Sequence, residues 1–179
     1  MTRFKEGYLA FDFGPRWQVI KLDEHRHYRE RLDKVTGTKA VDFIAIFDHK
    51  ELYLIEVKDF RRDRIANKER LSSGALAIEL AQKVRDSLAC IISANHTSSR
   101  PEEWRLYAKL LCNAKRRIKV VLWLEHDLPP HPPARKKMLQ SVRPNVFRRK
   151  LTWLTNRVFV FSRDNPGLPD VTVSNLPRS

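Results

Sequence analysis

The amino-acid sequence predicts one α/β domain built on a central mixed β-sheet flanked by helices, and three observations lead to this fold class. Two apolar, β-branched-rich runs flank a short polar turn, which is typical of a hairpin. A long stretch with apolar residues at helical spacing follows the hairpin. Further strands come only after a second helical stretch, and this order favours a mixed sheet. The length of 179 residues fits one domain, 1–179, with its motif core at about 24–94 and a basic C-terminal half completing the sheet.

The chain before the hairpin is the least determined part. Residues 8–13 and 17–22 are short segments of mixed character separated by Gly14-Pro15, and both a pair of strands and the start of a first helix fit them. Residues 25–34 are highly charged and run into a turn at 36–38, which indicates a helix.

The hairpin and the helix after it carry the strongest patterns. Residues 40–47 and 52–58 are the two predicted strands, joined by a turn at 48–50. Residues 59–70 form a strongly basic connection. Residues 71–94 then repeat apolar side chains at helical spacing, which predicts a long amphipathic helix.

The second half of the chain predicts shorter elements, for which Pro101 marks the first helical turn. In chain order we expect a helix at 101–113, a strand buried on both faces at 118–124, an irregular loop at 128–133, short basic helices at 134–140 and 146–153, and a strand at 157–161. The tail after Asn165 gives only weak strand signals.

The register of the hairpin brings two carboxylates together. A three-residue loop pairs Phe47 with Glu51 and so places Asp42 opposite Glu56, with Cβ atoms roughly 5 Å apart. A two-residue loop would set Asp42 against Val57 and mix the two faces of the hairpin. The hydrophobic pattern therefore selects the register that juxtaposes the carboxylates.

A lysine accompanies these carboxylates. Side chains alternate along a strand, so Glu56 and Lys58 share a face with Leu52 and Leu54. Two close, half-buried carboxylates repel unless a cation or proton lies between them. Oxygen ligands suit Mg²⁺ or Mn²⁺, which polarises a phosphoryl oxygen and activates water, while the ammonium of Lys58 positions that water or neutralises developing charge. The pattern indicates phosphodiester hydrolysis.

This arrangement resembles the PD-(D/E)XK nuclease superfamily, whose fold is called restriction-endonuclease-like. Here the motif reads Val-Asp42, thirteen residues, then Glu56-Val57-Lys58, and the resemblance covers roughly residues 24–94. It implies a mixed sheet flanked by helices, Asp42 and Glu56 as metal ligands, the carbonyl of Val57 as a further ligand, and Lys58 as the catalytic lysine. It also implies DNA rather than RNA as substrate, and a bacterial or archaeal cytoplasm.

The sequence departs from the family pattern in one place and leaves two others open. Val41 replaces the proline before the aspartate. Many members carry an acidic residue on the helix before the hairpin, and both Glu24 and Glu30 are candidates. Some members place a glutamine or lysine on the helix after the motif, where Gln82-Lys83 would suit.

Charge supports a polyanionic partner. Lys and Arg number 35 against 21 Asp and Glu, a formal net charge of +14. The basic connection directly follows the motif, so we expect it to contact a nucleic-acid backbone through Arg61, Arg62, Arg64, Lys68 and Arg70.

Several other classes of protein are disfavoured. Cys90 and Cys112 have no partner spacing for a disulfide framework or zinc site, which fits a reducing, cytoplasmic setting. No apolar run is long enough for a signal or membrane span, and P-loop, dinucleotide and serine-hydrolase motifs are absent. Trp104, Trp123 and Trp153 sit at apolar-periodic positions, so we expect core roles rather than base stacking.

The sequence thus predicts a Mg²⁺- or Mn²⁺-dependent nuclease acting on DNA. Two alternatives stay open: a catalytically inactive nucleic-acid-binding domain of the same fold, and a basic subunit of a larger nucleic-acid-processing complex. Since single-domain members of the family often pair to cut two strands, a homodimer is a further hypothesis, which light scattering tests.

Overall fold

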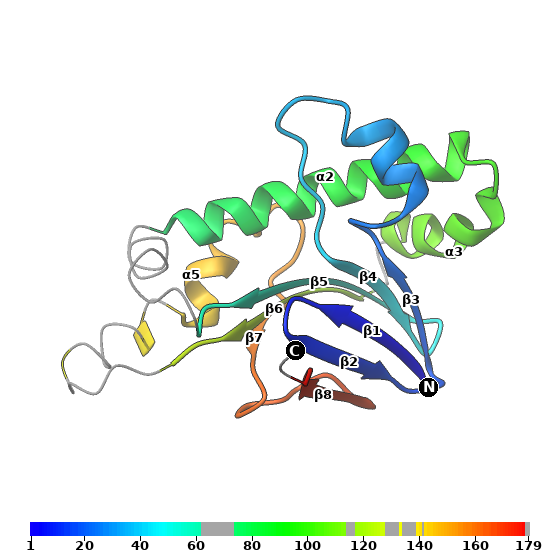
Figure 1. Cartoon of the computed structure of the whole chain (residues 1–179). Coiled ribbons are helices and arrows are strands. Elements are labelled where there is room, and N and C mark those ends of the chain that lie inside the picture. The colour runs from blue at the N-terminus through cyan, green and yellow to red at the C-terminus, as the bar shows by residue number, and fades with distance from the viewer. Residues whose placement is uncertain (62–73, 114–116, 128–132, 134–138, 141, 178–179) are drawn as a thin grey trace.

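The computed structural model describes the chain except residues 62–73, 114–116, 128–132, 134–138, 141 and 178–179 (Figure 1). Its elements, in chain order, are β1 (Thr2–Glu6), β2 (Leu9–Phe13), β3 (Trp17–Lys21), the short π-helix η1 (Tyr28–Leu32), β4 (Phe43–Phe47), β5 (Glu51–Asp59), α2 (Ala75–Thr97), α3 (Pro101–Cys112), β6 (Arg117–Glu125), α5 (Pro144–Arg148), β7 (Val158–Phe161) and β8 (Val171–Asn175).

The central sheet is mixed, as the element order predicts. Its five strands lie in the order β3-β4-β5-β6-β7. The pairs β3/β4 and β4/β5 are antiparallel, whereas β5/β6 and β6/β7 are parallel. A parallel neighbour needs a long crossover, and α2 and α3 supply it between β5 and β6.

The two faces of this sheet are covered differently. Helices α2, α3 and α5 pack on one face, over a core that includes Ile44, Leu54 and Leu122. The other face carries Phe43, Ile55 and Trp123, and it is covered by a second antiparallel sheet of order β1-β2-β8 (Figure 1). The predicted mixed sheet with flanking helices is confirmed, and the second sheet on the other face was not predicted. It covers this face because β2 presents aromatic side chains to it, and sheet-on-sheet packing buries them as a helix would.

The hairpin register was predicted correctly. Phe47 pairs with Glu51 and Phe43 with Ile55, around a turn in which Asp48 and His49 both adopt positive φ. The alternative left open for 8–13 and 17–22 resolves as strands, β2 and β3. The helix expected over 25–34 is confirmed over 26–32, as two α-helical residues followed directly by η1.

The helices and strands after the hairpin are of the predicted types, but their ends differ from the predicted ones. Helices α2 and α3 and strands β6 and β7 lie where the spacing predicts them, and β6 has consecutive buried residues from Val120 onward. The helix expected over 146–153 is wrong in extent, since α5 ends at Arg148 and turns follow it. The predicted loop at 128–133 and helix at 134–140 fall mostly outside the described residues.

The tryptophans separate into core and surface. Trp104 and Trp123 are buried, as expected, but Trp153 is 55% exposed and its core assignment was wrong. Because α5 ends early, Trp153 lies in a turn rather than on a helical face, and its indole N–H donates to the carbonyl of Lys150 at 3.0 Å. Cys90 and Cys112 are both free thiols. None of the described helices is both long and apolar enough to cross a membrane.

Candidate metal centre and ion-pair network

Asp42 is held at the point where β4 begins. Asp42 directly precedes Phe43, the first residue of β4, which pairs with Ile55 of β5. Continuing this register by one residue places Asp42 opposite Glu56. Oδ2 of Asp42 accepts a hydrogen bond from the backbone N–H of Val57 at 2.6 Å, and the Asp42 carbonyl accepts one from the N–H of Leu22 at 2.8 Å. The carboxylate is therefore held by β5, and the backbone of Asp42 is held by the residue that follows β3.

Glu56 is the most deeply buried carboxylate of the site. Its side chain is only 1% exposed, and its Oε1 has the ammonium nitrogens of Lys58 and Lys83 each at 2.7 Å. Its Oε2 is buried without a hydrogen-bond donor among the residues that the structure describes. Glu56 thus has one oxygen in ion-pair contact with two ammonium groups and a second oxygen with no donor among the described residues.

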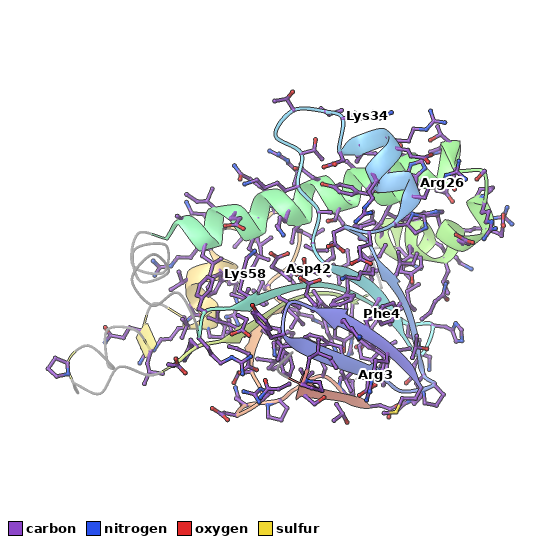
Figure 2. All side chains as sticks on the ribbon, viewed as in Figure 1. Arg3, Phe4, Arg26, Lys34, Asp42 and Lys58 are labelled. Atoms are coloured by element: carbon purple, nitrogen blue, oxygen red, sulfur yellow. The ribbon has the colours of Figure 1, made fainter. Side chains whose placement is uncertain are left out.

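Helix α2 contributes two charged side chains to the site. Glu79 and Lys83 are four residues apart and so share a face of the helix. Glu79 lies 3.2 Å from Lys58, and Lys83 lies 3.9 Å from Asp42 as well as pairing with Glu56. Figure 2 shows Asp42 and Lys58 together between α2 and the central sheet.

A second group of carboxylates meets Asp42 from other elements. Ligand oxygens of Glu6, Asp23 and Asp42 all lie within 4.8 Å of one another. Glu6 ends β1 of the smaller sheet, and Asp23 follows the end of β3. Lys21 lies 3.0 Å from Glu6, whereas Oδ1 of Asp23 is buried without a hydrogen-bond partner among the described residues.

Burial and neighbouring carboxylates raise the pKa values of Asp42 and Asp23. Burial, followed by the neighbouring charge of Glu56, raises the pKa of Asp42 from 3.8 to about 8. Burial and the nearby Glu6 also raise the pKa of Asp23. Burial by itself would lower the pKa of Lys58, but the charges of Glu56 and Glu79 outweigh it and raise that pKa, so Lys58 is an ammonium at neutral pH.

Among the residues that the structure describes, carboxylates outnumber ammonium groups in this contiguous set, even without Glu24, the exposed partner of Lys21. The carboxylates are Glu6, Asp23, Asp42, Glu56 and Glu79, and the ammonium groups are Lys21, Lys58 and Lys83. Of these carboxylates Asp42 and Glu56 are buried and the other three are partly buried. A bound divalent cation would offset their charge.

Three residues proposed from the sequence lie elsewhere. Glu24 pairs with Lys21 at 2.6 Å, and it lies one ion pair away from Glu6 rather than beside Asp42. Glu30 is exposed and pairs with Arg26, which Figure 2 shows well away from Asp42 and Lys58. Gln82 is exposed on another side of α2, while its neighbour Lys83 enters the site.

The basic connection, 59–70, is described only over residues 59–61. Arg61 pairs with Asp59 and donates to Oδ1 of Asn175 at 2.8 Å, so it ties the end of β5 to β8. The predicted backbone contacts Arg62, Arg64, Lys68 and Arg70 lie outside the described residues.

Sequence reasoning missed Glu6, Asp23 and Glu79. A signal existed for Asp23, since a strand at 17–22 antiparallel to the hairpin would end beside Asp42. Because the sequence leaves 17–22 undecided between strand and helix, it does not predict the position of Asp23. Glu6 belongs to a different sheet, and no local pattern links it to the motif.

Comparison with known proteins gives one limited likeness. No family model matches this chain, and no solved structure matches it. The cysteine–tRNA ligase of Neisseria meningitidis serogroup A is 30% identical over 153 residues, an alignment covering 70% of this chain and 21% of the ligase. This chain therefore spans about a fifth of the length of the curated relative that it matches.

Proposed function

We propose that the protein hydrolyses phosphodiester bonds of nucleic acid with the help of a divalent cation held at Asp42. The observation that carries this proposal is the buried Asp42 carboxylate between Glu56 on one side and Asp23 and Glu6 on the other. Buried carboxylates this close are stable together only with a proton or a cation between them. Mg²⁺ and Mn²⁺ prefer oxygen ligands of this kind.

The residues present fit such an ion. Asp42, Asp23 and Glu6 would hold it, and the buried Oε2 of Glu56 is the further oxygen with no donor among the described residues. The carbonyl of Val57, implied by the family resemblance, is the remaining proposed ligand. When bound, the ion supplies a polarised phosphoryl oxygen and a bound water of lowered pKa.

Lys58 has a defined role in this proposal. Its raised pKa keeps it protonated, so it is a hydrogen-bond donor and a positive charge, and it does not act as a general base. Glu56 and Glu79 hold its ammonium in place at 2.7 and 3.2 Å. In hydrolysis, water adds to phosphorus and one P–O ester bond breaks, and a fixed ammonium stabilises the negative charge that develops.

The charge of the protein indicates that the polymer to be cut is a nucleic acid. A net charge of +14 favours a polyanion, and the nuclease resemblance favours DNA. The partial match to a cysteine–tRNA ligase gives a specific reason to include tRNA among the substrates tested.

The test is cleavage of plasmid, linear, branched and single-stranded DNA, and of tRNA, with Mg²⁺, Mn²⁺ or EDTA. We expect metal-dependent products from the wild type, and loss of at least about a hundredfold in rate for Glu56→Gln and Lys58→Met. Glu30→Gln is the matched control, because it makes the same chemical change at an exposed pair away from the site. Salt-sensitive binding without cleavage of any substrate would refute the proposal and favour the inactive binding domain instead.

A further inference from the structure

A groove between α2 and the turns after α5 combines an exposed indole ring with two cationic side chains. It encloses about 460 Å³, and its lining is mostly apolar. Its walls come from α2 and from the turns after α5, which packs beneath the N-terminal half of α2 (Figure 1). The lining residues are Ile78, Ala81, Gln82, Arg85, Lys150 and Trp153.

Trp153 presents an apolar surface and little else to this groove. Its side chain is 55% exposed, whereas Trp17, Trp104 and Trp123 are each at most 8% exposed. The indole N–H is already used, since it donates to the Lys150 carbonyl at 3.0 Å. A ring with its only donor satisfied and its face open is suited to stacking rather than to hydrogen bonding.

The polar members of the lining match the other parts of a nucleotide. Arg85 and Lys150 are exposed cations, and no acidic residue lines the groove among the residues that the structure describes. The Nε–H of Arg85 donates a hydrogen bond to Asp86. The Arg85 side chain is nevertheless 64% exposed, and its other N–H groups remain available as donors. Gln82 offers an amide that can both donate to and accept from a base edge.

The groove adjoins the candidate site along the same helix. Ile78 and Gln82 immediately precede Glu79 and Lys83, the two α2 residues that face Lys58 and Glu56. The groove and the site therefore use different sides of the same helical turn of α2.

We propose that this groove binds one unpaired base of a nucleic-acid substrate, stacked on Trp153 with its phosphate near Arg85 and Lys150. A base held in a duplex cannot offer its face to Trp153, so the groove selects nucleic acid with a single-stranded or flipped-out nucleotide. This inference takes from the proposed function only the identity of the partner as nucleic acid.

The test is binding without cleavage, in EDTA, with labelled single-stranded oligonucleotides and a duplex of equal length. Since base–aromatic stacking is worth about 1–3 kcal/mol, Trp153→Ala should weaken single-strand binding about tenfold, while Trp153→Phe retains most of it. Val35→Ala changes another exposed apolar residue, which does not line the groove, and should leave binding unchanged. Duplex binding should be insensitive to all three changes.

Intrinsic fluorescence gives a second readout. Because the other three tryptophans are buried, quenching by a single strand should report Trp153 and vanish in Trp153→Phe. Equal single-strand affinity of Trp153→Ala and wild type, or a change of oligomeric state with Trp153→Ala in place of lost binding, would overturn the proposal. Stacking that persists in a protein that cuts nothing would refute the nuclease function and leave this groove assignment standing.

Discussion

Replacing Asp42 by asparagine should stabilise the metal-free protein at alkaline pH. The carboxylate is buried and lies beside Glu56, and its pKa is raised from 3.8 to about 8. The folded protein therefore binds a proton at Asp42 more tightly than the unfolded chain does. The resulting stability is present at acid pH and is lost as the pH rises from about 4 through 8.

The size of this change in stability follows from the pKa shift of Asp42. At about 1.36 kcal/mol per pKa unit, the change from 3.8 to about 8 corresponds to an upper limit of about 6 kcal/mol. Proteins relax around a buried charge, so we expect about half, ~3 kcal/mol, at pH 9. Asparagine keeps the acceptor for the N–H of Val57 and removes only the charge.

The assay is urea denaturation in EDTA at pH 5 and pH 9, followed by circular dichroism. Only the part of the shift above pH 5 is lost in this range, at most about 4 kcal/mol, so with the same relaxation the free energy of unfolding of the wild type should fall between these pH values by ~2 kcal/mol more than that of Asp42→Asn. Asp48→Asn is the control, because Asp48 is a solvent-accessible partner of Arg16 whose pKa is lowered. Parallel pH profiles for wild type and Asp42→Asn would refute the electrostatic reasoning.

Three further predictions concern the same network. Glu56→Gln should lower the pKa of Lys58, measured by NMR titration of the labelled lysine, and an unchanged value would mean that Glu56 does not hold its proton. Lys83→Met should reduce the free energy of unfolding by about 3 kcal/mol at pH 7 in urea denaturation, because it leaves Glu56 with one ammonium instead of two, and a neutral effect would contradict this pairing. Mn²⁺ affinity, measured by calorimetry, should rise between pH 6 and pH 9, since Asp42 must lose its proton to bind the ion, and a flat profile would argue against Asp42 as a ligand.

The motif could be predicted because its information is local. The alternation of apolar residues in the hairpin fixes which side chains share a face, and the turn fixes the register, so Asp42, Glu56 and Lys58 follow from about twenty residues. The face that Glu56 and Lys58 share is the face on which α2 packs, as their position beside Leu52 and Leu54 indicates.

The rest of the site depends on contacts between distant segments. Glu6 reaches Asp42 only because a separate three-stranded sheet packs on the far face of the central one, and that sheet pairs the first strands with the last. The sequence gives weak strand signals at both ends of the chain and nothing that pairs them. Trp153 was misassigned for a related reason, since apolar spacing does not show that α5 ends at Arg148.

The most direct test of the proposed metal centre is Mn²⁺ binding by isothermal titration calorimetry at pH 8. The account predicts one site in the wild type, and a loss of affinity of tenfold or more in Asp42→Asn and Asp23→Asn. Glu30→Gln, whose carboxylate pairs with Arg26 away from the site, should bind as the wild type does. Wild-type protein that binds no Mn²⁺ at millimolar concentration, or binding unchanged by both aspartate substitutions, would contradict it.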